Sequence, residues 1–179
     1  MSGGSLRNRA GIFLVAVVVS LSACASANAN PGWQCATYAR QIAPVSLRGN
    51  AWTWWQQAEG QYERGQIPKI GAVMVFKRTA MMPKGHVAVV RRVISPREVL
   101  VEQANWGSAE DGNRGQISAG DRVIDISAKN DWTNVRVWYA PVNDFGRANP
   151  VYGFIYPPSY DPRTGVQWNA TEDMPGNPG

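Results

Sequence analysis

Cysteine and histidine are scarce in this chain, which has 2 cysteines and 1 histidine among its 179 residues. A typical zinc site takes three or four ligands of these types, so the sequence supports no metal site. Glycine-rich phosphate-binding loops are also missing, and no other cofactor motif is present. We therefore expect any chemistry here to use side chains alone, without a cofactor.

Long apolar runs and dense positive charge are missing as well. The uncharged apolar stretch at residues 11–21 is about half as long as the roughly 20 residues that a membrane-spanning helix needs. The formal net charge of +5 includes Arg7 and Arg9, which precede this stretch. Because there is no polybasic patch or basic–aromatic stripe, nucleic acid is not an expected partner.

The N-terminal segment has the layout of a secretory signal, with two arginines, an apolar stretch and then small residues. Its end, Leu21-Ser22-Ala23-Cys24, resembles the lipobox of bacterial lipoproteins, which implies that Cys24 is lipidated and becomes the first mature residue. Alternatively, signal peptidase cleaves after Ala29 and discards Cys24. Both interpretations place the rest of the chain outside the cytoplasm, in the cell envelope or periplasm, and the first adds a lipid anchor in a membrane.

The remaining length fits one domain with its own core and is too short for two. We expect a signal peptide at residues 1–23, a linker at 24–32 and a single domain at 33–156. Residues 157–179 are rich in Pro, Gly, Asn and Asp, and this composition predicts a flexible tail.

Two helices and a run of strands are expected in the domain. Residues 33–42 should form a helix with Asn30 as N-cap and Pro31 in the first turn. Residues 51–63 look like a second helix closed by Gly65. Apolar and β-branched runs then predict strands at 72–77, 86–94, 98–104, 123–127, 135–139 and 153–156. This order predicts an α+β fold, with the helices packed on one face of a five- to six-stranded antiparallel sheet.

Cys35 is the one thiol left once Cys24 is lipidated or removed. It cannot form an internal disulfide, although disulfides normally persist outside the cytoplasm. A helix start near Cys35 would stabilise a thiolate through unpaired backbone N–H groups, and a neighbouring imidazolium would do so further. The alternative is a small buried and inert side chain.

The single histidine, His86, opens a predicted strand directly after Gly85. This position suits the general base of a Cys/His pair, whose imidazole must itself be oriented by a third group. Glu102 would accept from the ring and stabilise the imidazolium, whereas Asn105 or Gln103 could orient it without charge. His86 could instead be a structural turn residue.

Four segments together resemble the CHAP domains (cysteine, histidine-dependent amidohydrolases/peptidases), which are related to NlpC-type and papain-like hydrolases. The matching segments are residues 33–39 (WQCATYA), 68–76 (PKIGAVMVF), 85–90 (GHVAVV) and 102–106 (EQANW). The resemblance implies a papain-like α+β fold that cleaves amide bonds of peptidoglycan. It implies Cys35 as nucleophile, His86 as base, and Glu102 with Asn105 as polar partners.

One feature departs from the family pattern, in which the acidic residue and the asparagine are commonly two positions apart. Glu102 and Asn105 are three apart and would point to opposite faces of a regular strand. Either a bulge near Ala104 brings them together, or one of them serves, and Glu102 is the favoured third member.

Trp33 and Gln34, beside Cys35, and Trp106, after Asn105, are candidates to line a substrate groove. The predicted function is therefore a peptidoglycan amidase, or an endopeptidase of the stem peptide or crosslink. An activator protein is conceivable but leaves no mark in the sequence. Alternatives are a catalytically inactive envelope lipoprotein that binds the wall or a partner, and another acyl-transfer enzyme on the same fold.

Overall fold

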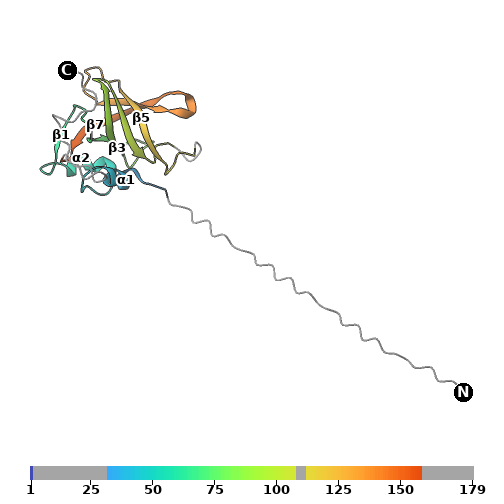
Figure 1. The fold of residues 1–179 in the computed structure, drawn as a ribbon. Helices are drawn as coiled ribbons and strands as arrows, with labels where there is room; N and C mark the ends of the chain where they lie inside the picture. Colours follow the sequence, from blue (N-terminus) through green and yellow to red (C-terminus); the bar gives the residue numbers. More distant parts are fainter. Residues whose placement is uncertain (2–31, 108–111, 159–179) are drawn as a thin grey trace, which may run out of the picture.

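The computed structural model describes residue 1 and residues 32–107 and 112–158, which form a small domain dominated by β-structure (Figure 1). The elements in chain order are the helix α1 (Cys35–Ile42), the 3-10 helix η1 (Ala51–Thr53), the helix α2 (Trp54–Gln57), the strands β1 (Glu63–Gly65), β2 (Val73–Phe76), β3 (His86–Ser95), β4 (Glu98–Ala104), β5 (Ile117–Asp125) and β6 (Asn134–Tyr139), the 3-10 helix η2 (Ala140–Val142) and the strand β7 (Asp144–Tyr156).

The strands form one antiparallel sheet in the order β1-β7-β2-β3-β4-β5-β6. The sheet also closes on itself, because β7 pairs with β6 through residues up to Pro150 and with β2 from Val151 onward. Pro150 lacks the N–H that a central strand needs, and it sits where the strand changes partner. The result is a small barrel with α1 against β3 and β4 near one end (Figure 1).

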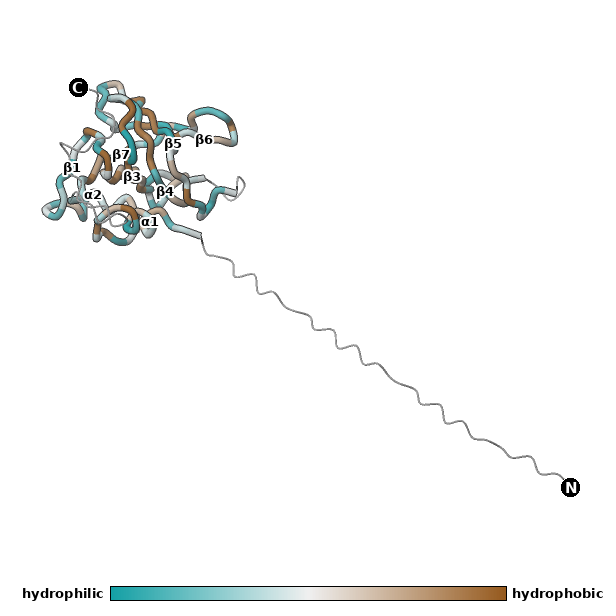
Figure 2. The backbone as a smooth tube through the Cα atoms, viewed as in Figure 1, coloured by the Kyte–Doolittle hydropathy of each residue, from teal (hydrophilic) through white to brown (hydrophobic). Residues whose placement is uncertain are grey.

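Apolar side chains pack on both faces of the central strands. Val73 and Val75 of β2 join a cluster with the buried residues of α1, whereas Met74 and Phe76 join a second cluster inside the barrel. Because strand side chains alternate between faces, β2 must be apolar throughout, and all four of its residues are buried. Figure 2 shows apolar stretches running along these central strands.

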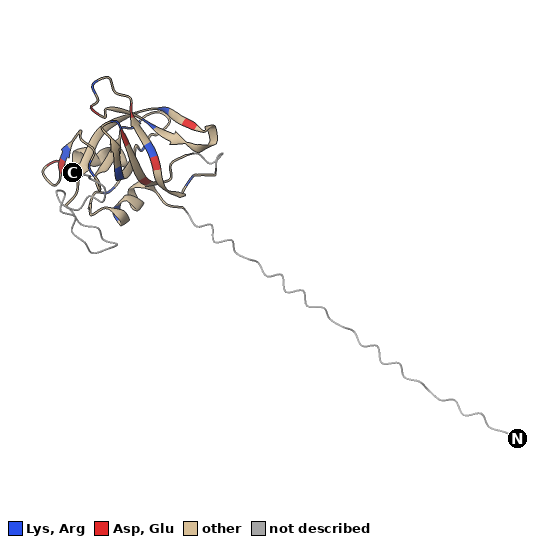
Figure 3. Ribbon diagram, turned by 45° about the horizontal axis from the view of Figure 1, so that its top comes forward, with Lys and Arg blue, Asp and Glu red and all other residues tan. Residues whose placement is uncertain are grey.

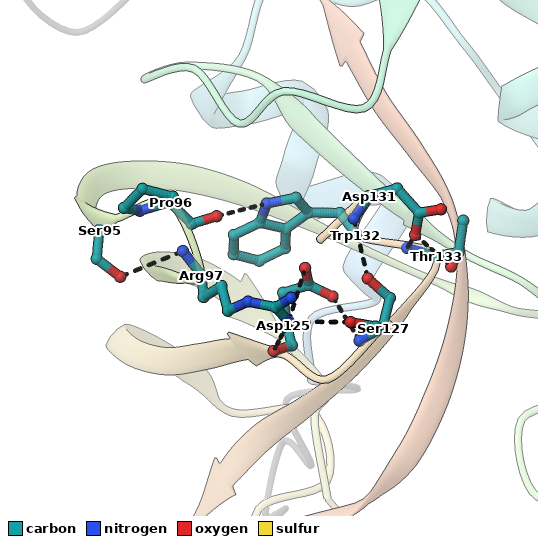
Figure 4. A network of polar contacts seen from close by, with 8 residues as sticks. All are labelled: Ser95, Pro96, Arg97, Asp125, Ser127, Asp131, Trp132 and Thr133. Atoms are coloured by element: carbon teal, nitrogen blue, oxygen red, sulfur yellow. Dashed lines mark hydrogen bonds and ion pairs between the residues drawn. The ribbon is translucent and has the colours of Figure 1, made fainter. Parts of the chain in front are cut away.

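A polar network secures the end of the barrel where β3 turns into β4 (Figure 4). Arg97 in this turn donates to the carbonyl of Ser127 at 2.9 Å and lies 3.6 Å from the buried carboxylate of Asp125. Trp132 donates its indole N–H to the carbonyl of Pro96 at 3.1 Å. The start of β3 and the end of β4 lie at the opposite end of these strands, so the network leaves that end open.

The structure corrects several details of the expected fold, although an α+β domain with an antiparallel sheet is present. The sheet has seven strands, because the predicted helix at 51–63 stops at Gln57 and β1 follows, with Gly65 in that strand. The first helix begins at Cys35 with Gln34 as N-cap, whereas the predicted cap Asn30 and Pro31 lie outside the described residues. No two-helix layer of the expected length is found in the described residues.

The predicted signal peptide, the lipidation site Cys24 and almost all of the predicted tail lie outside the described residues. Within residues 32–107 and 112–158, no helix has the length and apolar character needed to cross a membrane.

Candidate active site

Cys35 is the first residue of α1, where the chain enters the helix from an extended N-cap residue, Gln34. No side chain caps this helix start, so its first backbone N–H groups are available to other acceptors. The amide of Ala36 donates to the Cys35 sulfur, and so does the amide of Val87 from the neighbouring strand β3. The thiol is partly exposed, as a nucleophile must be.

His86 opens β3 and is 3% exposed. Its ring packs edge-on against Phe76 and Trp106, with centroid distances of 5.4 and 4.8 Å. Gly85 is required just before it, because its φ is +67° and a Cβ there would lie 2.7 Å from the backbone nitrogen of Trp52. The close approach of these chain segments holds the imidazole at the rim of the barrel.

Cys35 and His86 line the same cleft and act on each other electrostatically, although 50 residues separate them in the chain. Burial raises the pKa of the Cys35 thiol, but the charge of His86, its hydrogen bond and the amides of Val87 and Ala36 outweigh burial and lower the pKa overall. A lowered pKa increases the thiolate fraction near neutral pH, and the thiolate is the nucleophilic form of cysteine. The pair therefore has the electrostatics of an activated nucleophile.

The third polar group at the imidazole is Gln103. Its Oε1 lies 2.9 Å from His86 Nε2, and the side chain is 1% exposed. Because the ring has two nitrogens, this contact leaves Nδ1 for the sulfur of Cys35. Gln103 can therefore orient the ring without adding a charge.

This arrangement corrects the expectation that Glu102 is the favoured third member. The side chain of Glu102 lies on the face of β4 opposite to that of Gln103. There it accepts from the hydroxyl of Tyr38 and from Arg91 Nε at 2.7 Å. Alternation along the strand explains the difference, since adjacent residues point to opposite faces. Glu102 thus ties α1, through Tyr38, to strands β3 and β4.

Asn105 lies at the rim of the site but does not bond to the imidazole in the described contacts. Its φ of +60° ends the strand, and its side chain accepts from the amide of Gly115 at 2.8 Å and donates to Gln34 Oε1 at 3.3 Å. No register shift occurs at Ala104, so the expected bulge there is absent from the described pairing. Asn105 therefore holds the entry to α1 rather than the ring of His86.

A cleft of about 1020 Å³ opens over Cys35 and His86. Gln34 and Trp106 line it, as expected from the sequence, whereas Trp33 borders a separate small hollow beside Gly115 and stacks edge-on against Tyr38. The cleft exceeds the usual volume of a small-molecule pocket, which is about 300–1,000 Å³. Its size suits a branched or polymeric substrate.

The cleft is also basic. Charged residues are spread over the strands and loops (Figure 3), and the ion pairs found in the described residues use Arg64, Arg91, Arg97 and Arg122. Five other basic side chains line the cleft, with no acidic residue among the described lining: Arg40, Arg48, Lys84, Arg114 and Arg147. An anionic substrate would therefore meet a favourable potential there.

Comparison with known families gives one match, in which residues 25–105 fit the CHAP domain. Over these residues the chain is similar to the CHAP domain family. The matched segment includes Cys35, His86 and Gln103 and ends at Asn105, so the resemblance stated from the sequence is confirmed. No curated protein matches the chain significantly.

Gln103, one of the two uncharged candidates from the sequence, also fits the family spacing. The family spacing of two positions before an asparagine falls on Gln103, with Asn105 as the asparagine, and an amide stands where the family commonly has an acid. The carboxylate favoured from the sequence, Glu102, lies one position earlier and contacts Tyr38 and Arg91. The two-residue spacing before Asn105 indicates the position that contacts the ring better than the charge does, because residues two apart lie on the same face of a strand.

CHAP domains are typically hydrolases, and this match associates the chain with amidase or peptidase activity related to peptidoglycan. Strands β5, β6 and β7 lie beyond the matched segment.

Proposed function

We propose that the protein is a cysteine hydrolase that cleaves an amide bond of peptidoglycan, either between muramic acid and the stem peptide or within the peptide. The observation that carries this proposal is that Cys35 and His86 line the same wide cleft, where His86 lowers the pKa of the thiol. The basic lining favours stem peptides, because these carry free carboxylates.

The proposed reaction needs only side chains of the chain and water. The Cys35 thiolate attacks the amide carbonyl, and the tetrahedral intermediate collapses to a thioester as His86 gives its proton to the leaving amine. Water, deprotonated by the now neutral imidazole, then attacks the thioester carbonyl. The acid is released and the sulfur returns to the thiolate beside the imidazolium.

Release of soluble muropeptides from purified sacculi tests the proposal. Wild-type protein is expected to release fragments with new amine and carboxyl ends, and Cys35→Ala to release none. His86→Ala is expected to lose at least about a hundredfold in rate, which is typical of removing a general base. Cys24→Ser is the matched thiol control, because Cys24 precedes the segment matched to the family, and its rate should equal that of wild type. Equal absence of release from wild type and Cys35→Ala would refute the enzyme and favour a wall-binding module.

We also propose, from the sequence around Leu21-Ser22-Ala23-Cys24, that the protein acts in the envelope on a lipid anchor at Cys24. The mass of the mature N-terminal peptide tests this point. An acylated Cys24 is the expected result, whereas an unmodified N-terminus at residue 30 would show ordinary cleavage after Ala29.

A further inference from the structure

A β-bulge in β5 turns Asp121 toward the active site. Along β4 and β5, Gln103 pairs with Ser118 and Glu102 with Ala119, but Val101 pairs with Asp121, so Gly120 is an extra residue. Gly120 has a φ of +83°, the left-handed conformation that glycine adopts readily. If the register of Gln103 and Glu102 continued without the bulge, Gly120 would pair with Val101, and Asp121 would lie opposite Leu100 on the other face of the sheet. The bulge therefore places Asp121 on the face that also carries Gln103.

The side chain of Asp121 contacts Gln103 directly. Gln103 Nε2 donates to Asp121 Oδ2 at 2.7 Å, and the hydroxyl of Ser118 donates to the same oxygen. With the contact between Gln103 and His86, these bonds form a continuous chain from Ser118 through Asp121 and Gln103 to the imidazole. Neither Ser118 nor Asp121 lies in the segment matched to the CHAP family.

An ionised aspartate accepts hydrogen bonds but cannot donate them, so it decides which way the amide of Gln103 faces. The reversed amide would put Gln103 Oε1 against a carboxylate oxygen, two acceptors in contact. Because Asp121 holds Nε2 of Gln103, Oε1 of Gln103 must face His86. There it accepts from the Nε2–H group of the imidazole. The imidazole then keeps its proton on Nε2, and its unprotonated Nδ1 is the nitrogen available to take the thiol proton.

Other groups around His86 do not make this choice of tautomer. The rings of Phe76 and Trp106 cover two sides of the imidazole and offer no acceptor oxygen. Cys35 is the group whose proton the imidazole would accept. Lys84 and Arg114, which line the cleft nearby, are cations and cannot accept from the ring.

We propose that Asp121 is a positioning residue of the active site, which fixes the amide of Gln103 and through it the tautomer and orientation of His86. This inference rests on the proposed function, in which His86 serves Cys35. Asp121 does not touch the substrate in this scheme, and its effect should appear in kcat and in the reactivity of Cys35, with little change in KM.

The first test compares Asp121→Leu with Asp121→Asn in full-length protein that also carries Cys24→Ser, so that Cys35 is the single thiol. Leucine offers no acceptor and leaves the Gln103 amide free to turn its N–H groups to the ring. We expect iodoacetamide to label Cys35 about ten- to a hundredfold more slowly at pH 7, a loss comparable to that for outer partners of metal-bound imidazoles. Asparagine keeps an acceptor oxygen and should lose less. Asp144→Leu removes an exposed carboxylate at the start of β7 and is the matched control, with no change expected.

The second test exchanges the amide of Gln103 and the carboxylate of Asp121. It does not depend on whether the leucine variant folds. Gln103→Glu alone would place two carboxylates in the contact that now measures 2.7 Å, and their repulsion should displace the new side chain and slow labelling. In the double variant Gln103→Glu/Asp121→Asn, the new amide can donate to the new carboxylate, which still accepts from His86. We expect labelling to recover at least tenfold over Gln103→Glu.

The double variant also carries a signature that a purely structural role would not produce. A carboxylate directly on the ring stabilises the imidazolium, so the alkaline limb of the pH profile of kcat/KM should move to higher pH than in wild type. Wild-type labelling for Asp121→Leu, or no recovery in the double variant, would overturn the inference. Absence of muropeptide release by wild type, with the labelling pattern intact, would refute the proposed function and leave the positioning role standing.

Discussion

Replacing Glu102 by Gln tests whether Glu102 stabilises the packing of α1 while Gln103 orients the imidazole of His86. The Glu102 side chain is 11% exposed and accepts from both Tyr38 and Arg91, whose side chain is 23% exposed. Arg91 Nη2 has no hydrogen-bond partner among the described residues, so its guanidinium depends on Glu102. Removing the negative charge leaves this cation partly buried without a counter-charge.

The expected loss follows from these contacts. A hydrogen bond to a charged group contributes about 1.5–3 kcal/mol, and breaking a fully buried ion pair costs about 3–5 kcal/mol. Glutamine keeps the volume and one acceptor, and Arg91 can reach water. We therefore expect the free energy of unfolding to fall by about 1–3 kcal/mol, which lowers Tm by roughly 3–10 °C for a domain of this size. Labelling of Cys35 at 25 °C should stay within about twofold of wild type, because Gln103 still holds the ring.

Thermal unfolding and the rate of Cys35 alkylation, measured on the same samples, check both halves of this prediction. Glu98→Gln is the matched control on the same strand, because its ion-pair partner Arg122 is about half exposed and the pair should contribute less than about 1 kcal/mol. If Glu102→Gln slowed alkylation as strongly as His86→Ala and left Tm unchanged, Glu102 would act on the imidazole, and the assignment of Gln103 would be wrong.

Two further predictions concern the thiol and the cleft. The lowered pKa of Cys35 means that its alkylation should stay fast as pH falls below the range in which an ordinary thiol becomes protonated, and should decline only on passing its own lower pKa. His86→Ala removes the charge and hydrogen bond that lower this pKa and leaves the effect of burial, so the onset of alkylation should move to higher pH in a pH series. Because the cleft is lined by basic side chains such as Arg48 and Arg147, KM for soluble anionic muropeptides should rise between 0.05 and about 0.5 M salt while kcat changes little. A KM independent of salt would show that these cations do not meet the substrate.

Local patterns predicted much of this fold. Strand β2 is buried and apolar at all four positions, and β3 is buried over its first five residues, so their apolar runs predict strands from the sequence alone. The short strand β1 was mistaken for the end of a helix, since Glu63, Arg64 and Gly65 have no strand pattern of their own. Pairing with β7 makes these three residues a strand, and that information is not local.

The site divides in the same way. Apart from the predicted lipidation site Cys24, the chain offers one cysteine and one histidine, and the order of the CHAP-like segments joins them, so the pair Cys35 and His86 could be predicted from the sequence alone. The family pattern is enough to predict that these two side chains lie close together.

Which polar group holds the imidazole was decided by the tertiary structure. Gln103, Glu102 and Asn105 are all chemically able to contact a ring, and the difference between them is a matter of strand face and backbone turn. Asp121 reaches Gln103 because one extra residue at Gly120 shifts the register of β5. Composition and motif therefore determined the proposed nucleophile and base, whereas register, which depends on pairing between distant segments, determined which polar groups contact them.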